Sequence, residues 1–393
     1  MQTFSQIDPA RKIHFGAGLL AQTAAMVDQI EGAGGSQRSG RVLVVAGAQM
    51  AKSPLLKRLL DTLGDRVGAV LTGITPHSGP DWVRKGLAMA GQCKADVMVS
   101  IGGGSTLDTA KIIALGALLG GDIADLRIKP PFNAALNAQK MLDPVLTHIC
   151  IPTTGSGSEV TPGGGLRAPD GSKWIYWHVS MPPQIILLDP EVAATTPVDI
   201  AAGSSMNSLA HAVEALYAAN RQPVTDAFAL ASMEKFGRWL PQLVKSAEDI
   251  EVRGEIQQAW LLAGMSICNA RTALHHTMCH CLGSKFDVSH GNANAIMLPH
   301  VMEFNLPAAE LPLARAGRAF GRSGTNAEAA RGAIEVVREF QKALGLPTRL
   351  RDVGVPIEGL EAVAEHAMQE RGTHFNPRKV QPEEMIKLYR AAW

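Results

Sequence analysis

The stretch ADVMVSIGGGSTLDTAKIIALGALL, residues 95–119, decides the fold of this chain. Its first seven residues form a β-rich apolar run, and the residues after Ser105 carry a helical pattern. Gly102, Gly103 and Gly104 join the two, and glycines let a phosphate approach the backbone closely. The amides and the positive dipole end of a following helix stabilise such an anion. Because the G-x-G-x-x-G spacing is absent, a pyrophosphate site and a plain tight turn both remain open.

The same alternation of strand and helix extends to both sides of this stretch. Helical patterns separate four further β-rich runs: RVLVVA (41–46), RVGAVLTGI (66–74), THICIP (147–152) and QIILLDP (184–190). Such alternation predicts βαβ units on a mostly parallel, Rossmann-like sheet. After residue 192 the β-signals largely vanish and helical periodicity takes over, as in SSMNSLAHAVEALYA (204–218). We therefore expect an α/β domain over 1–192 and a helical domain over 193–393.

The composition limits the classes of function. The 393 residues are 46% hydrophobic, enough to bury a large core in two domains. With 37 basic and 36 acidic side chains, nothing favours nucleic acid or an anionic membrane, so a small molecule is the expected partner. The chain shows no bilayer-spanning apolar run and no signal-peptide core, and its five cysteines suit reduced thiols. We expect a cytoplasmic protein.

Polar residues follow a second strand in the run PTTGSGSE, residues 152–159. Thr153, Thr154 and Ser158 place hydroxyls at the carboxyl end of a parallel strand, where a ligand in the sheet crevice would meet them. A Ser/Thr-rich turn that caps the next segment is the alternative. Two such loops after two separate strands favour ligand binding.

Asn207 and His211 are four residues apart in an apolar-periodic run, so they share one face of a helix. A carboxylate at position 207 would have indicated half of a metal site. An amide is a far poorer ligand for a cation, so the metal site that this pattern suggests lacks its negatively charged ligand. The histidines either still hold an ion or have another role.

A histidine-rich block spans residues 275–300. His276 and His280 are four apart and share a helical face, whereas His275 lies off that face. His290 follows a polar turn. A single histidine is more often structural than functional, but these residues and His211 come from helical segments on both sides of a long insertion. We expect them to converge on one site.

Four segments, GGGSTLDTAK, PTTGSGSEVT, DPEVAATTP and the histidine block, occur in an order and at separations that resemble the iron-containing (group III) alcohol dehydrogenase family. The resemblance runs from residue 14 nearly to the end. It implies an N-terminal dinucleotide-binding α/β domain, a C-terminal helical domain and an active site in the cleft between them. It also implies NADH or NADPH as cofactor and a homodimer.

Within that family, metal-dependent members use an aspartate and three histidines as ligands. The positions that match are Asn207, His211, His276 and His290, and His280 matches a histidine near the nicotinamide. Replacement of the aspartate is typical of the maleylacetate reductases, which work without a metal. The stretches at 206–223 and 273–290 also resemble that branch. The resemblance thus implies reduction of maleylacetate, or of a related conjugated oxo-acid, to 3-oxoadipate or its counterpart.

The chemistry of that reaction assigns roles to the candidate residues. Hydride added to the far alkene carbon pushes negative charge onto the ketone oxygen, and histidines can donate to that oxygen and later protonate carbon. We expect His276 and His280 to be the hydrogen-bond donor and the general acid. We expect His211, His290 and Asn207 to line the same active site. For the dianionic substrate we choose the two cations that flank the histidine block, Arg271 and Lys285.

Gly47 gives a clue to cofactor choice. Many family dehydrogenases place an aspartate there, where it binds an adenosine ribose and repels a 2′-phosphate. Glycine removes that repulsion, so we expect NADPH to be accepted alongside NADH, unless Gly47 is only a turn residue. The predicted cofactor-binding residues are Gly47, Gly102, Gly103, Gly104, Ser105, Asp108, Thr153, Thr154, Ser158 and Lys173.

Two other functions stay open. The runs HGNANAIMLPHVMEFN (290–305) and TTGSGSEVT (153–161) resemble the metal-dependent alcohol dehydrogenases, which act on small alcohols and aldehydes. In that case His211, His276 and His290 would hold iron or zinc, as three histidines do in some zinc sites. A non-redox lyase or a catalytically silent cofactor-binding protein on the same scaffold is the third possibility.

Overall fold

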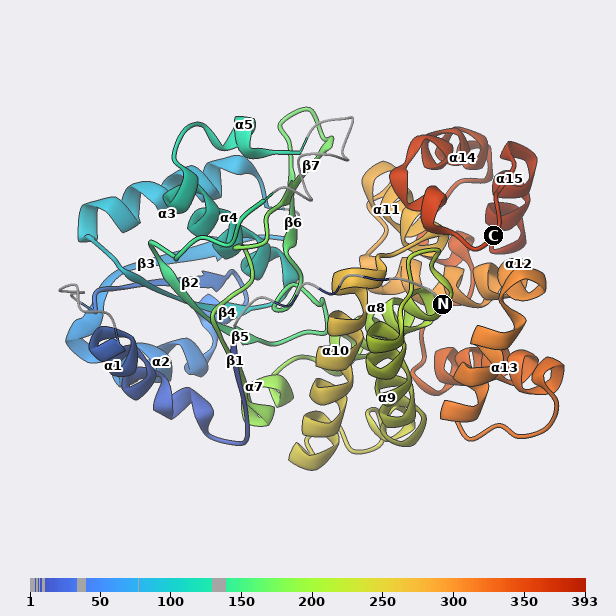
Figure 1. Cartoon of the computed structure of the whole chain (residues 1–393), viewed down its shortest axis with the longest axis horizontal. Helices are drawn as coiled ribbons and strands as arrows, with labels where there is room; N and C mark the ends of the chain where they lie inside the picture. Colours follow the sequence, from blue (N-terminus) through green and yellow to red (C-terminus); the bar gives the residue numbers. More distant parts are fainter. Residues whose placement is uncertain are drawn as a thin grey trace. The chain divides into compact units, whose positions relative to one another are not determined.

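The computed structural model describes residues 11–33, 40–76, 78–128 and 139–393, together with Phe4, Gln6 and Asp8. The chain divides into two compact units (Figure 1). Residues 8–154 and 158–195 form the sheet unit, and residues 1–7, 155–157 and 196–393 form the helical unit. The short segment 155–157 therefore belongs to the helical unit although its neighbours in sequence belong to the sheet unit.

The sheet unit is built on six parallel strands in the order β1-β8-β5-β4-β2-β3. The strands are β1 (Lys12–Phe15), β2 (Val42–Gly47), β3 (Val67–Ile74), β4 (Val97–Gly102), β5 (Thr147–Pro152) and β8 (Ile185–Leu188). The five β-rich runs all form strands of this sheet, which confirms the predicted parallel α/β fold. The sequence patterns missed β1 and an antiparallel hairpin formed by β6 (Gly163–Arg167) and β7 (Lys173–Trp177).

Alternating side chains bury both faces of the sheet. Val42 and Val44 pack with the helices of one face, α1 (Thr23–Ala33) and α2 (Pro54–Leu63), whereas Leu43 and Val45 pack with α3 (Pro80–Cys93) and α4 (Gly104–Leu119) (Figure 1). Burial on both faces explains why these strands are apolar throughout. The short helices α5 (Ile123–Leu126) and α7 (Pro190–Ala194) complete this unit's described helices.

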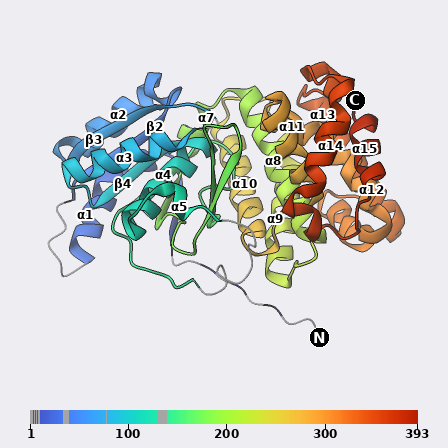
Figure 2. The same ribbon diagram turned by 90° about the horizontal axis from the view of Figure 1, so that it is seen from above.

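The helical unit confirms the predicted change after residue 192. It contains the helices α8 (Val198–Tyr217), α9 (Pro223–Trp239), α10 (Ile250–Ala270), α11 (Leu274–Phe286), α12 (His290–Ala319), α13 (Asn326–Ala343), α14 (Leu360–Gln369) and α15 (Pro382–Ala391) (Figure 2). They enclose two apolar cores. Helix α12 supplies side chains to both, such as Leu298 to the core of α8 to α10 and α13, and Ile296 to the core of α11, α14 and α15.

The structure also bears on the expected absence of membrane spans and on the expected state of the cysteines. Within the described ranges, no helix combines the length and the apolar character that crossing a bilayer requires. All five cysteines are free thiols, as expected, and four of them are buried.

Candidate active site

Helix α8 presents three polar side chains on one buried face. Asn207, His211 and Glu214 lie at i, i+4 and i+7, a spacing that aligns them along one side of a helix. Asn207 and His211 are each only 5% exposed, and Glu214 is fully buried. Polar groups buried this deeply require partners, and α11 and the loop at 155–157 supply several of them.

Glu214 connects α8 to the first turn of α11. Its Oε2 lies 2.7 Å from His276 Nδ1 and accepts the amide of Ala273 at 3.0 Å. Its Oε1 accepts the amide of His275 at 2.7 Å. Sequence reasoning missed Glu214, although its spacing from His211 was a signal, because the pattern carries no sign that its partner is a histidine 62 positions away.

The four histidines predicted to converge lie together. The rings of His211 and His276 stack at 4.5 Å between centroids, and those of His280 and His290 stack at 5.4 Å. The His276 ring centroid is 6.1 Å from that of His280 and 5.9 Å from that of His290. His280 and His290 are partly exposed, whereas His211 and His276 are buried. The cluster therefore has an inner pair and an outer pair.

His275 also belongs to this cluster, although it lies off the helical face that His276 and His280 share. Its ring meets the ring of His276 edge to face at 5.0 Å. Burial lowers the pKa of His275 to about 4 and holds the pKa of His211 well below its usual value, so both rings are neutral near pH 7. Burial also raises the pKa of Glu214.

Asn207 is held in one orientation by the loop at 155–157. Its Nδ2 donates to the carbonyl oxygen of Gly155 at 3.0 Å, and Ser208 Oγ donates to the same oxygen at 2.6 Å. The amide of Gly155 in turn donates to Ser204 Oγ at 2.6 Å. Because Nδ2 is used in this way, Oδ1 is the atom that faces His276 Nε2, at 3.3 Å.

A close approach of two glycines fixes the start of α12. A Cβ atom added at Gly291 would lie 2.8 Å from the Cα atom of Gly203 in α8, so only glycines allow the two backbones to meet there. His290 directly precedes Gly291 and is the first residue of α12. The crossing thereby sets the distance of His290 from the polar face of α8.

In the sheet unit, two predicted glycines lie at the carboxyl ends of adjacent strands. Gly47 ends β2 and Gly102 ends β4, and the order of the sheet reverses between these strands. A Cβ at Gly47 or Gly102 would lie 2.7 or 2.9 Å from Thr106 Oγ1, and one at Gly103 would lie 3.2 Å from Thr154 Oγ1. Side chains are therefore excluded at the point where open α/β sheets bind ligands.

The remaining predicted residues of this region lie around that turn. Gly104 and Ser105 begin α4, whose amino end follows the turn without a side-chain cap. Thr153 is buried, and its amide donates to the carbonyl oxygen of Gly102 at 3.0 Å. Lys173 begins β7 and is exposed.

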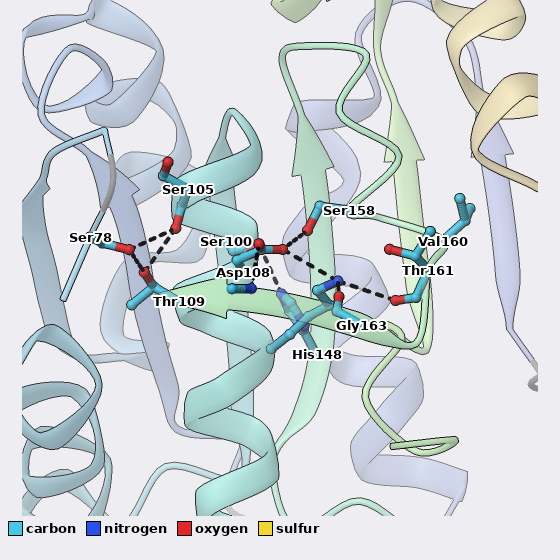
Figure 3. A network of polar contacts seen from close by, with 12 residues as sticks. Ser78, Ser100, Ser105, Asp108, Thr109, His148, Ser158, Val160, Thr161 and Gly163 are labelled. Atoms are coloured by element: carbon cyan, nitrogen blue, oxygen red, sulfur yellow. Dashed lines mark hydrogen bonds and ion pairs between the residues drawn. The ribbon is translucent and has the colours of Figure 1, made fainter. Parts of the chain in front are cut away.

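Helix α4 anchors the segment that follows the second polar loop (Figure 3). One oxygen of Asp108 accepts the hydroxyl of Ser158, and the other accepts the amide of Gly165 at 2.9 Å. Lys111, one turn further along α4 and fully buried, donates to carbonyl oxygens in the segment 161–163. Both Asp108 oxygens thus have partners within the protein, and a role of Asp108 and Ser158 toward a cofactor remains a prediction.

Three buried groups near this anchor were not predicted. A hydrogen bond of 2.7 Å joins His148 Nε2 and Ser100 Oγ (Figure 3). Burial lowers the pKa of His148 to about 3. Burial raises the pKa of Glu159 to about 7, against the opposing effect of Lys111. No pattern distinguishes these residues in the sequence, because neutral buried polar groups occur in many strands and loops.

Models of known protein families match the segments that contain both sites, the glycine turn at the strand ends and the histidine cluster beside Asn207. The family model described as "Iron-containing alcohol dehydrogenase" matches residues 10–190. The model described as "Fe-containing alcohol dehydrogenase family, C-terminal" matches residues 201–393. The chain belongs to the iron-containing alcohol dehydrogenase family.

Relatives in this family include both alcohol dehydrogenases and maleylacetate reductases. The NAD-dependent methanol dehydrogenase of Bacillus methanolicus is 31% identical over 397 residues and covers 98% of both chains. The maleylacetate reductase of Sphingobium indicum is 30% identical over 379 residues, 96% of this chain and 94% of its own. A crystal structure of 1,3-propanediol oxidoreductase matches with a TM-score of 0.90 at 28% identity, covering 100% of both chains. Family members are NAD(P)-dependent oxidoreductases.

The residues of the sheet unit fit the dinucleotide of this family. Gly102 has φ +150 and, like Gly103, has no room for a side chain, so a pyrophosphate could approach the backbone there. The turn leads into α4, a helix of 16 residues whose amino end favours an anion. Gly47 and Thr106 adjoin the same turn.

The residues of the helical unit do not fit the iron site of this family. Among the described residues, one group of three His, Cys, Asp or Glu side chains brings its ligand atoms within 4.8 Å of one another, and it is Glu214, His275 and His276. Those atoms already serve hydrogen bonds to each other and to the backbone. Among the same described residues, the histidines at the family's ligand positions form no such group, and Asn207 offers only a neutral amide oxygen.

The two predicted substrate cations lie at opposite ends of α11. Arg271 is the C-cap of α10, shortly before α11, with φ +68, and burial together with the charge of Arg371 lowers its pKa to about 10. Lys285 lies in the last turn, is exposed, and has its Nζ 5.9 Å from the ring centroid of Phe286. Arg271 is the better placed of the two, because it lies beside the turn that contacts Glu214.

Proposed function

We propose that the chain is an NAD(P)H-dependent reductase of maleylacetate or a related conjugated oxo-acid, which works without a catalytic metal. The observation that carries this proposal is the fixed amide of Asn207, whose Nδ2 donates to Gly155 and whose Oδ1 faces His276. A carboxylate at position 207 would place an oxygen against the carbonyl of Gly155. The maleylacetate reductases among the relatives support the same reaction.

The histidines supply what a metal would otherwise supply. The chemistry that a nicotinamide cofactor would supply, when bound, is hydride for the alkene carbon farther from the ketone. His276 and His280 then stabilise the enolate oxygen by hydrogen bonds, and one histidine donates the proton that the carbon next to the ketone requires. Neutral His211 stacks on His276.

Positive charge beside α11 supports an anionic substrate. Arg271 and Arg371 are close enough for the charge of Arg371 to lower the pKa of Arg271, so positive charge is concentrated there. We propose Arg271 as a residue that binds a substrate carboxylate.

Metal removal tests this proposal. We expect NADH oxidation by maleylacetate to proceed unchanged in a strong chelator, with iron and zinc well below one ion per chain. Asn207→Asp is the matched variant. It should bind zinc or iron, because it gains an anionic ligand, and unfold more readily without metal by about 1–3 kcal/mol, because an oxygen replaces the donor to Gly155. Stoichiometric metal and chelator-sensitive activity in the natural chain would contradict the proposal.

The choice of nicotinamide is tested at Gly47. We expect both NADPH and NADH to be used, and Gly47→Asp to lower kcat/KM for NADPH relative to NADH by more than about tenfold, through repulsion of a 2′-phosphate. A Cβ at this position would lie 2.7 Å from Thr106 Oγ1, so Gly47→Asp is compared with and without Thr106→Ala. An unchanged ratio in both backgrounds, or no NADPH turnover by the natural chain, would refute this expectation.

A metal-dependent alcohol dehydrogenase is the second candidate. It is favoured by the methanol dehydrogenase relative, which is as similar as the reductases, and by His211 Nδ1, which is buried without a hydrogen-bond partner. The chelator experiment, extended to small alcohols and aldehydes, separates the two candidates.

A further inference from the structure

The proposed function gives no role to Glu214, although this residue constrains the histidine cluster more strongly than any other residue without an assigned role. It is a fully buried carboxylate on which three nitrogen atoms converge, those of the Ala273 amide, the His275 amide and His276 Nδ1. The two amides belong to the start of α11, where helices have unsatisfied N–H groups. Glu214 thus holds the backbone and one side chain of the same turn.

The neighbours of His275 determine which of its nitrogens carries the proton. Its Nε2 lies 3.2 Å from the carbonyl oxygen of Asn294, which can only accept a hydrogen bond. Because burial keeps this ring neutral, one nitrogen is protonated, and that nitrogen is Nε2. His275 Nδ1 therefore carries a lone pair.

The proton of His276 follows from its own neighbours. His276 Nδ1 faces Glu214 Oε2 at 2.7 Å and His275 Nδ1 at 3.4 Å. Glu214 Oε2 already accepts the amide of Ala273, so both neighbours of His276 Nδ1 act as acceptors. Nδ1 must then be the donor. Nε2 faces the amide oxygen of Asn207 at 3.3 Å, which also only accepts, so these contacts place a donor at both ring nitrogens of His276.

From this arrangement we infer that Glu214 is a positioning residue, which keeps a proton on His276 Nδ1 and holds the first turn of α11 so that Nε2 faces the side of Asn207. The consequence for catalysis rests on the proposed function, since it requires His276 to act on the substrate. The assignment of the proton does not. Carboxylates that orient a functional histidine through its second nitrogen are a recurring device in protein sites.

The position of the proton can be measured directly. Long-range proton–nitrogen correlation spectra of protein labelled with 15N-histidine distinguish protonated from bare Nδ1, and His276→Asn identifies the His276 signals among the 12 histidines. We expect Nδ1 of His276 to be protonated in the natural chain at neutral pH. A bare Nδ1 would overturn the inference.

Two variants separate positioning from simple stability. Glu214→Met removes both acceptor oxygens, so we expect His276 to lose the Nδ1 proton and to keep the Nε2 proton, which Asn207 Oδ1 accepts. Glu214→Gln keeps one acceptor oxygen. With that oxygen on Ala273 and His276, the NH2 group meets the N–H donor of His275 and this hydrogen bond is lost, so we expect Nδ1 to stay protonated at a cost in stability. If His276 keeps its Nδ1 proton in Glu214→Met, Glu214 does not position it.

Kinetics give the functional readout. We expect kcat to fall about 10- to 100-fold in Glu214→Met, with little change in KM and partial recovery in Glu214→Gln. Asp226→Asn is the matched control, because it removes another buried carboxylate of the helical unit, one that pairs with Arg221 and Arg315. It should lower stability without changing kcat or the His276 spectrum. A Glu214→Met kcat equal to that of Asp226→Asn would overturn the inference.

The outcomes also distinguish this inference from the proposed function. If the natural chain fails to reduce maleylacetate while its His276 spectrum behaves as expected, the proposed function fails and the assignment of Glu214 stands. If Glu214→Met does not fold, the natural chain alone decides through the protonation of Nδ1.

Discussion

Replacing His276 with asparagine is expected to lower kcat by about 100- to 10,000-fold, the range for loss of a general acid or base. Asparagine can keep a donor near Glu214 Oε2, where His276 Nδ1 now lies at 2.7 Å. It has no atom in the place of Nε2, which faces Asn207. The loss should therefore appear in turnover far more than in folding.

The measurement is the rate of NADH oxidation with maleylacetate, together with urea unfolding followed by circular dichroism. His300→Asn is the control, since His300 lies on α12 in the same unit, is also largely buried and has no contact with the cluster in the described structure. We expect its kcat to remain that of the natural chain. If His276→Asn keeps a rate near that of this control, the assignment of His276 as a catalytic residue is wrong.

Replacing Gly155 with alanine is expected to reduce the free energy of unfolding by about 1–3 kcal/mol, the usual cost of overpacking. A Cβ at this position would overlap Ser208 Oγ and the ring of Trp260. Neither neighbour can move freely, because Ser208 donates to the Gly155 carbonyl and Trp260 Nε1 donates to Ser205 Oγ at 2.9 Å. A shift of Gly155 would also release Asn207.

Urea unfolding and turnover measure the two parts of this effect. Gly91→Ala is the control, because a Cβ at Gly91 meets nothing within 4 Å and alanine favours a helix more than glycine. It should be neutral or slightly stabilising, with normal activity. Equal stability of Gly155→Ala and Gly91→Ala would show that the loop at 155–157 adapts without strain.

Much of the fold could be predicted because local patterns report burial. The apolar runs of β2, β4, β5 and β8 are buried on both faces, so their sequences show it directly. A spacing of four residues predicts that Asn207 shares a helical face with His211, and His276 with His280. The side chains of both pairs lie in the same cluster. Such relations depend only on the geometry of one element.

The rest could not be predicted, because it depends on contacts between distant segments. Strand β1 has four residues and exposed side chains, and β6 contains three glycines, so neither carries a strand pattern. His275 lies off the helical face of His276 yet contacts its ring. Glu214 is 62 positions from the histidine it contacts, and Gly155 is 52 from Asn207.

The sequence by itself determined the alternation of five strands with helices, the helical character of the C-terminal part, the glycine turn and the presence of an amide where related enzymes carry a carboxylate. Only the tertiary structure decided what that amide does. Hydrogen bonds to Gly155 fix which end of Asn207 faces His276, and Glu214 fixes which nitrogen of His276 faces Asn207. The physical reason is that a donor or acceptor acquires its role from its partner, and these partners meet only when α8, α11 and the loop at 155–157 pack together.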